Sequence, residues 1–272
     1  MNRDAYVAAN RAAWDATAPQ HLEAARWQEL SEGFSRPGFT CLDPVLAGLV
    51  ERSGGVAGRD IAHLCCNNAC ELLSLRNMGA ARCTGFDQSA AFLGQGRELA
   101  RIAGQEVELV AGDVYALPSA YDGAYDIVLV TCGALGWMPD LPAFARTAAR
   151  LLRPGGALLV AEQHPVLDMF LPDADRPFEI ADPYFADRPY AGEAAIVYDG
   201  AAPAKVPVNY WFTHPLSAVV TAALDAGLRL ESLQEYPINI SSAQFAIYES
   251  PNGANMPLSY AMTARKAPQK AA

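Results

Sequence analysis

The chain has few basic residues and no long apolar run, and each of these features excludes a class of function. It carries 20 Lys and Arg against 30 Asp and Glu, a net charge of −10, with no basic cluster. Binding to phosphate backbones needs such a cluster, so we expect no nucleic-acid partner. No apolar stretch is long enough to cross a bilayer, and Met1–Asp4 begin no signal peptide. We therefore expect a cytoplasmic protein that does not bind membranes.

Paired metal-ligand spacings are missing as well. Structural zinc sites usually combine two Cys pairs, or one Cys pair with histidines. The six cysteines offer no second pair, so we expect no metal and reduced thiols that act as small apolar groups. They are Cys41, Cys65, Cys66, Cys70, Cys83 and Cys132.

Glycine is absent from a loop where a nucleotide-binding protein commonly has it. Residues 60–89 have the pattern of a strand, a loop of small residues (65–69), a helix (70–78) and a second strand that ends in Asp87. Small residues let a ligand approach the backbone, and the helix start offers free N–H groups. A carboxylate at the tip of the second strand suits the two hydroxyls of a ribose. The stretch therefore predicts a nucleoside-containing cofactor, while the missing G-x-G-x-x-G opposes NAD and FAD.

Three further strands follow in a regular order. Residues 109–114 form a strand with Asp113 at its end, and residues 125–131 form a buried one. Residues 151–160 combine a helix end, the turn Arg153-Pro-Gly-Gly and a hydrophobic strand. Over residues 58–165 this series resembles the class I S-adenosyl-L-methionine (SAM)-dependent methyltransferases. It departs from their motif I, because Cys65, Asn67 and Ala69 stand where glycines usually stand and His63 replaces a common Asp. Asn tolerates positive φ, so Asn67 or Asn68 is expected to make the turn.

The resemblance implies an α/β fold: a Rossmann-like, doubly wound, seven-stranded sheet with one antiparallel edge strand. It implies SAM as the cofactor, with Asp87 on the ribose and Asp113 on the adenine amino group. The cofactor-binding residues that it implies are Cys65, Cys66, Asn67, Asn68, Ala69, Asp87, Gln88, Asp113, Val114, Thr131 and Cys132.

The flanking regions predict covers for this core. Residues 3–30 have the pattern of two short helices broken at Pro19, followed by a loop over residues 31–41. The run Asn10-Arg-Ala-Ala-Trp-Asp15 resembles the opening of a subgroup of small-molecule methyltransferases, in which this segment forms a lid. After the fifth strand the chain is irregular, rich in proline and aromatic residues, as binding loops often are. The expected parts are a helical lid (1–55), the SAM-binding core (56–165), a substrate cap (166–210) and the rest of the sheet (211–272).

The acceptor and the chemistry are less defined by the sequence. We expect a small, aromatic or apolar acceptor methylated at O, N or C, and a homodimer is possible. His164 follows the fifth strand and is the candidate base, since its ordinary pKa suits proton transfer. Candidate acceptor-binding residues are Tyr6, Trp14, His21, Trp137, Phe170, Tyr184, Trp211 and His214. Two alternatives stay open: a SAM-binding protein without transferase activity, and another nucleotide-dependent α/β enzyme.

Overall fold

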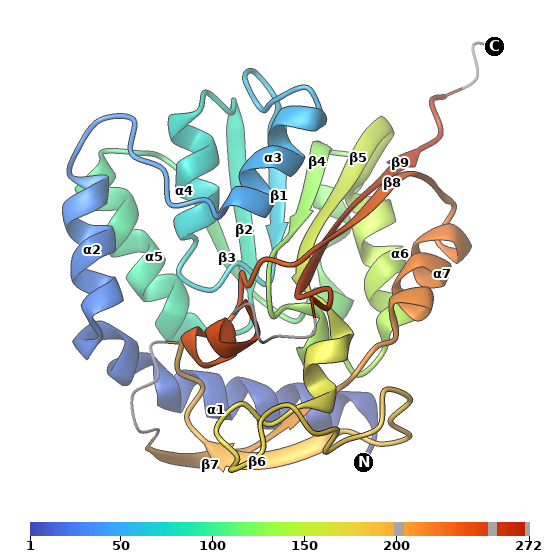
Figure 1. Ribbon diagram of the computed structural model, residues 1–272. Coiled ribbons are helices and arrows are strands. Elements are labelled where there is room, and N and C mark those ends of the chain that lie inside the picture. The colour runs from blue at the N-terminus through green and yellow to red at the C-terminus, as the bar shows by residue number, and fades with distance from the viewer. Residues whose placement is uncertain (199–203, 250–254, 270–272) are drawn as a thin grey trace.

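A seven-stranded mixed sheet forms the centre of the computed structural model, which describes residues 1–198, 204–249 and 255–269 (Figure 1). Its strands are β1 (Asp60–Leu64), β2 (Arg82–Asp87), β3 (Glu108–Ala111), β4 (Tyr125–Val130), β5 (Leu152–Gln163), β8 (Leu228–Tyr236) and β9 (Ser259–Lys266). They lie in the order β3-β2-β1-β4-β5-β9-β8, and β9 runs antiparallel to both of its neighbours. This confirms the expected fold class. The single antiparallel strand lies one place inside the edge, because β8 pairs with its outer side.

Helices cover both faces of the sheet (Figure 1). The α-helices are α1 (Arg3–Glu23), α2 (Ala25–Phe34), α3 (Pro44–Arg52), α4 (Cys70–Asn77), α5 (Ala90–Ala103), α6 (Leu141–Leu151) and α7 (Leu216–Asp225). The 3₁₀ helices are η1 (Val114–Ala116), η2 (Ser119–Tyr121), η3 (Leu135–Trp137), η4 (Pro165–Met169) and η5 (Ala243–Glu249). Buried side chains of α6 and α7 pack on one face, and those of α3, α4 and α5 on the other.

The central strand β4 shows why the core needs both layers. Val128 and Val130 pack into the cluster of α6 and α7, whereas Ile127 and Leu129 pack into the cluster of α3 to α5. A parallel strand buried on both faces is hydrophobic at every position rather than at alternate ones. This continuous run is what identified the strand in the sequence.

The helical lid differs from its expected form. Pro19 lies inside α1, which continues to Glu23, so the predicted break at Pro19 is wrong. Contacts on both sides of the proline hold the helix, since Trp14 and Ala18 before it are buried against α5 and His21 after it contacts the Phe92 ring at 4.9 Å. Helix α2 also extends to Phe34, into the expected loop, because its apolar side packs on α5. Tertiary burial thus outweighs the local signals.

The expected cap contains regular structure. Strands β6 (Tyr190–Ala194) and β7 (Lys205–Trp211) form an antiparallel hairpin where we expected an irregular segment. Residues 199–203 of this region lie outside the described residues. Helix α1 and the hairpin lie together across the carboxyl end of the parallel strands (Figure 1). They are therefore placed to cover a ligand at that edge.

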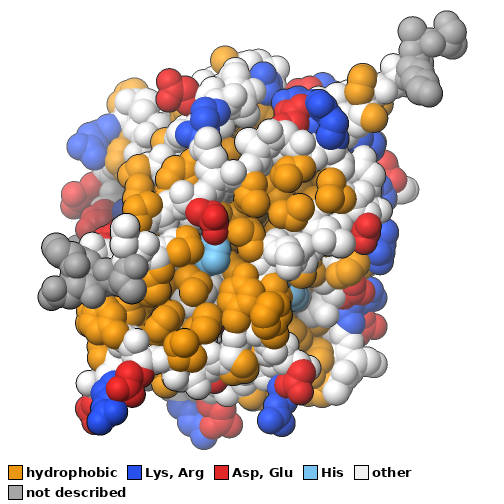
Figure 2. Space-filling view, turned by 45° about the vertical axis from the view of Figure 1, so that its right-hand side comes forward, with side chains coloured by type: hydrophobic (Ala, Val, Ile, Leu, Met, Phe, Trp, Pro, Cys, Tyr) orange, Lys and Arg blue, Asp and Glu red, His pale blue; other side chains and the backbone are white. Residues whose placement is uncertain are grey.

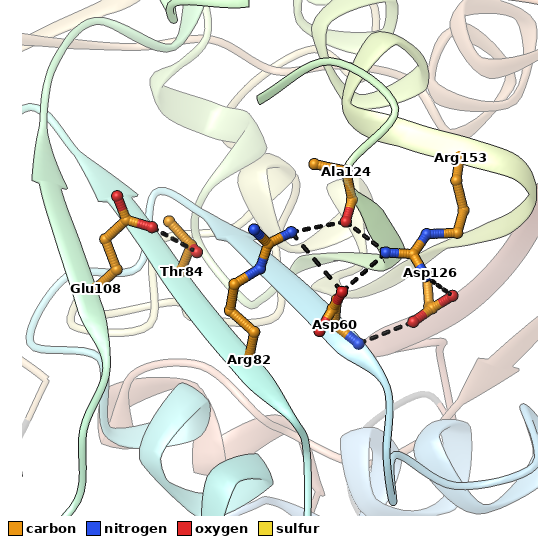
Figure 3. Close-up of polar contacts among 7 residues, drawn as sticks. All are labelled: Asp60, Arg82, Thr84, Glu108, Ala124, Asp126 and Arg153. Carbon is orange, nitrogen blue, oxygen red and sulfur yellow. Dashed lines mark hydrogen bonds and ion pairs between the residues drawn. The ribbon is translucent and has the colours of Figure 1, made fainter. Parts of the chain in front are cut away.

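The opposite edge of the sheet is held by a charged network (Figure 3). Nη2 of Arg153 donates to Asp60 (2.8 Å) and to the carbonyl of Ala124 (2.6 Å), while Nη1 is 2.9 Å from Asp126. Arg82 donates to the same carbonyl at 2.7 Å. The arginine of the Arg-Pro-Gly-Gly turn thus joins the starts of β1, β4 and β5, far from the ligand edge.

One face of the molecule carries many exposed hydrophobic side chains (Figure 2). Several large ones belong to the segment after η4, including Phe178 (44%), Ile180 (68%) and Phe185 (77% exposed). None of the helices in the described part of the chain combines the length and apolar character needed to span a membrane.

Candidate cofactor and acceptor site

The loop between β1 and α4 has the backbone form of a glycine loop without any glycine. Cys65, Asn67 and Ala69 have φ angles of 55°, 51° and 59°, in the left-handed region. These are the three positions at which the resemblance places glycines. We expected positive φ only at an asparagine, and the structure adds two residues. The N–H of Ala69 donates to the carbonyl of Cys66 at 2.7 Å, which closes the turn before α4.

Asp87 lies at the tip of β2, directly beside this loop. Its carboxylate accepts the N–H groups of Asn67 and Ser89, both at 2.8 Å. Burial raises the pKa of Asp87 to about 6, and these two N–H groups act against that rise. Gln88 follows and is half-buried. An ionised, half-buried carboxylate here fits two ribose hydroxyls, as the sequence predicts.

The next two strand ends bring the remaining predicted cofactor residues to the same edge. Asp113 follows β3, and its carboxylate accepts the N–H of Tyr115 at 2.9 Å, while Val114 is buried beside it. Thr131 follows β4, and its hydroxyl is 2.9 Å from Nε2 of His63. Burial lowers the pKa of His63 to about 3, so this imidazole is neutral. Cys132 is half-buried beside Thr131.

Glu162, at the end of β5, is a site residue that the sequence reasoning did not select. Its buried carboxylate accepts N–H groups from Gly133 (2.5 Å), Leu135 (3.1 Å) and Gln163 (2.8 Å). Burial raises the pKa of Glu162 to about 7. The side chain therefore fixes the loop after β4. The sequence could have indicated Glu162 by its position, because it is an acid at the end of a strand. Asp87 at the end of β2 and Asp113 after β3 have the same kind of position.

A small cavity of about 20 Å³ lies next to Glu162. Asp168 of η4, Trp211, His214 and Tyr260 line it as well. The Asp168 carboxylate accepts Nε2–H of Gln163 (3.2 Å) and the Thr213 hydroxyl (2.9 Å), and burial raises its pKa to about 6. The sequence analysis selected Trp211 and His214 but missed Asp168 and Tyr260.

A larger groove of about 570 Å³ lies on the other side of His214. Tyr6, Arg3 and Asp140 line it together with the outer residues of α7. Nε2 of His214 is 2.9 Å from the carbonyl of Met138, and burial lowers the pKa of this imidazole. The fold thus brings Tyr6, Trp211 and His214 together, although they lie far apart in the sequence.

The remaining aromatic candidates fall into two groups. Trp14, His21 and Trp137 form a cluster, in which the Trp14 ring is 5.4 Å from that of Trp137, and Trp137 reaches Trp211 at 5.0 Å. Phe170 instead packs against Tyr248, in a separate hydrophobic cluster.

Tyr184 has a role in the start of α7, because its hydroxyl accepts the N–H of Leu216 at 3.1 Å. Neither Tyr184 nor Phe170 lines the cavity or the groove. The structure therefore does not support them as acceptor-binding residues.

His164 is also placed differently from our expectation. Nδ1 accepts the N–H of Val166 at 3.1 Å, and Nε2 is 2.9 Å from the Glu235 carboxylate on β8. Burial lowers the pKa of His164, and the nearby Glu235 acts against that change. The ring does not line the acceptor cavity. These contacts favour a structural role, so the choice of His164 as base is not supported.

The Asn-Arg-x-x-Trp-Asp segment fastens α1 over the site. Asn10 is fully buried; it donates to the carbonyl of Tyr210 (3.0 Å) and accepts the N–H of the same residue (2.7 Å). Asp15 accepts the hydroxyl of Ser89 at 2.6 Å, at the start of α5. The helix is thereby joined to both β7 and the segment that follows Asp87.

This fold is Rossmann-like, and the predicted cofactor residues lie at the carboxyl end of its parallel strands. Residues 61–156 match the family of methyltransferase domains. No curated protein matches the chain. Among solved structures, a SAM-dependent methyltransferase from Mesorhizobium loti is similar in fold, with 19% identity, a TM-score of 0.54, and coverage of 81% of this chain and 96% of the other.

Two further structures have the same fold at low identity. A SAM-dependent methyltransferase from Methanosarcina mazei is 16% identical, with a TM-score of 0.55 over 84% of this chain and 99% of the other. The [4+2]-cyclase SpnF is 17% identical, with a TM-score of 0.54 over 82% of each chain. The domain match over residues 61–156 supports a SAM-dependent methyltransferase with SAM as its cofactor, and these solved structures share the fold. The match opposes the alternative of an NAD-dependent enzyme.

Proposed function

We propose that the protein transfers the methyl group of SAM to a small molecule at oxygen, nitrogen or carbon. The observation that carries this proposal is the cover over the ligand edge. Helix α1 and the β6–β7 hairpin lie across it, and a groove of about 570 Å³ between the start of α1, the start of α6 and α7 shares His214 with the small cavity. Such a volume is in the range of small-molecule sites. The net charge of −10 further disfavours a nucleic-acid acceptor.

Methyl transfer from a sulfonium is an in-line displacement, so the protein mainly aligns the reactants and excludes water. In this chain Glu162 positions the loop after β4, whereas Asp168 is held by two side-chain donors beside the cavity. A carboxylate whose pKa is raised toward neutrality suits the removal of an acceptor proton. We therefore assign that step to Asp168, in place of His164. Trp211, whose side chain also bonds to Asp168, and Tyr260 line the cavity with it.

The test is a transfer assay with methyl-labelled SAM and three acceptor classes: phenols, amines and acidic carbon compounds. We expect label in one class of small molecule. Asp168→Asn should lower kcat by about 10²-fold or more if the acceptor must lose a proton. His164→Gln should leave kcat within a few-fold. Label that enters only added protein or RNA, with none in small molecules, would overturn the proposal.

One observation favours a second candidate, a SAM-binding protein without transferase activity. The same fold occurs in a [4+2]-cyclase, so the fold alone does not require methyl transfer. Calorimetry with SAM, followed by the transfer assay, separates the two. Tight SAM binding without label in any acceptor class would favour this candidate.

A further inference from the structure

Acidic and aromatic side chains line the small cavity beside Glu162, and none of the described Lys or Arg residues does. Its carboxylates belong to Glu162 and Asp168, and its aromatic rings to Trp211, Phe212 and Tyr260. In the described part of the chain, the donors to both carboxylates are neutral N–H and O–H groups, and neither carboxylate pairs with a cation. The negative charge of the cavity is therefore available to a ligand.

Tyr260 brings a buried hydroxyl without a partner to this cavity. It lies opposite Glu162 in the register of β5 and β9, and directly opposed residues of neighbouring strands point to the same face of a sheet. The side chain is 1% exposed, and among the described residues no hydrogen bond involves its hydroxyl. A buried polar group normally has a partner, because leaving it unpaired is costly. The phenol therefore indicates a polar group of a ligand in the cavity.

The cavity has room for one small polar group. Its volume is about 20 Å³, and a water molecule needs about 10–15 Å³ of such space. An amino group has nearly the size of a water molecule, whereas an aromatic ring is several times larger. The reacting group of an acceptor thus fits inside, and the rest of that molecule stays outside the cavity.

We propose that this cavity holds the amino group of an amine acceptor, bound as an ammonium by the Asp168 carboxylate and the Tyr260 hydroxyl. An ammonium has three N–H donors, which suit a carboxylate and a hydroxyl oxygen, and aromatic faces attract a cation. A phenolate or a carbanion, in contrast, would be repelled by the two carboxylates. Burial lowers the pKa of His214, so this lining imidazole adds no positive charge that would favour an anion.

The inference names the acceptor class of the proposed methyl transfer and rests on it. The ammonium first gives a proton to Asp168, which leaves a neutral amine with a free lone pair. That lone pair forms the new N–C bond to the methyl group, while the electrons of the broken C–S bond stay on sulfur. The product leaves as a methylated ammonium, and Asp168 returns its proton to water.

The first measurement needs no methyl transfer. Calorimetry with the full chain compares benzylamine with benzyl alcohol, which has nearly the same shape but no charge. We expect the amine to bind about 10-fold more tightly or better, because its hydrogen bonds are charge-assisted. Tyr260→Phe removes only the hydroxyl, so it should lower this preference several-fold and leave the SAM affinity unchanged.

Tyr125→Phe is the matched control, because it removes a buried hydroxyl at the start of β4, at the opposite edge of the sheet. It should leave both affinities as in wild type. Equal binding of amine and alcohol, or an unchanged preference in Tyr260→Phe, would overturn the assignment. If Tyr260→Phe does not fold, the comparison of amine and alcohol in the wild-type protein decides alone.

The transfer assay with labelled SAM separates this inference from the proposed function. Label in amines, with a KM for the amine that rises about 10-fold or more in Tyr260→Phe, supports both. Label only in phenols or acidic carbon compounds would overturn the inference and keep the proposed function. No label in any small molecule, together with an amine preference that depends on Tyr260, would contradict only the proposed function.

Discussion

Three residues with a Cβ atom hold left-handed backbone conformations in the cofactor loop, and this has an energetic cost. Asn67 tolerates the conformation, but Ala69 has no polar side chain to compensate for it. Ala69→Gly should stabilise the protein by about 0.5–1 kcal/mol, since relief of about 1–2 kcal/mol exceeds the entropy gained by the unfolded chain. Urea unfolding measures this change. Ala91→Gly, at an exposed position of helix α5, is the control and should be destabilising. A destabilised Ala69→Gly would show that the alanine methyl packs more favourably than its conformation costs.

Asp87 gives a second prediction at the level of one residue. Its carboxylate accepts the N–H of Asn67, and we propose that it also binds the ribose, so Asp87→Asn should weaken SAM binding by about 2 kcal/mol. Calorimetry measures the loss. Asp122→Asn, a surface carboxylate paired with Arg150, is the control. Unchanged SAM affinity in Asp87→Asn would remove Asp87 from the cofactor site.

Single residues also mark the limit of what the sequence predicted. The positions of Asp87 and Asp113 at strand ends were predicted correctly, because strand ends can be recognised from hydrophobic runs. Asp168 and Tyr260 were missed, since they reach the cavity from η4 and from β9, and no local spacing relates them. His164 was chosen for its chemistry, but its ring faces Glu235 on a strand more than 60 residues away. Side-chain direction after a strand is set by tertiary contacts that one sequence does not reveal.

At the scale of elements, α1 depends on one buried asparagine. Asn10→Ala would leave both backbone groups of Tyr210 without their partner, at a cost of about 1–3 kcal/mol. We expect α1 to loosen, so that hydrogen exchange in residues 3–23 becomes faster and turnover falls more than SAM affinity. Arg11→Ala, exposed on the same helix, should change neither. Equal exchange in both variants would show that other contacts hold the helix.

Strand β5 depends on the network in Figure 3. Arg153→Met would remove the bonds to Asp60 and Asp126 and lower the free energy of unfolding by about 1–2 kcal/mol. Arg101→Met removes an exposed arginine that pairs with Glu98 and should cost much less, because solvent screens that ion pair. Urea unfolding compares them. Because the network lies at the far edge, SAM affinity of folded Arg153→Met should equal that of wild type, and a large loss would contradict this placement.

At the scale of the whole molecule, the order of the parallel strands was predictable, because each is a continuous apolar run followed by a turn or an acid. The form of the covering layer, helix α1 with the β6–β7 hairpin, could not be predicted from the sequence. Helix α1 and the hairpin gain their stability from each other and from α5, through buried contacts such as Asn10 with Tyr210. Proline and aromatic residues suggested an irregular cap, yet strand pairing outweighed those local preferences.

Buried carboxyl groups and buried histidines make opposite contributions to the pH dependence of the free energy of unfolding. A carboxyl group whose pKa is raised in the folded state contributes stability that is fully present below its unfolded pKa of about 4. That stability is lost as the pH rises through the folded pKa. Histidines with a lowered pKa destabilise the folded state as pH falls below about 6.5. The carboxyl groups are Asp87, Glu162 and Asp168, and the histidines are His63, His164 and His214. At pH 6.5 an unfolded histidine is still half protonated, so the histidines oppose the carboxyl groups until about pH 7.5.

Between pH 6.5 and pH 8 the protein should therefore lose stability relative to its Glu162→Gln variant, because the pKa of Glu162 is raised to about 7. The expected relative loss is about 1 kcal/mol, since the histidines and the other two carboxyl groups contribute equally to both proteins. Urea midpoints of both proteins without SAM, at constant salt, measure it. Glu162→Gln keeps the acceptor oxygen but cannot ionise, whereas Glu98→Gln, an exposed control, should follow the wild-type profile. Parallel profiles of wild type and Glu162→Gln would mean that Glu162 is already ionised at pH 6.5, with its three N–H donors outweighing the effect of burial.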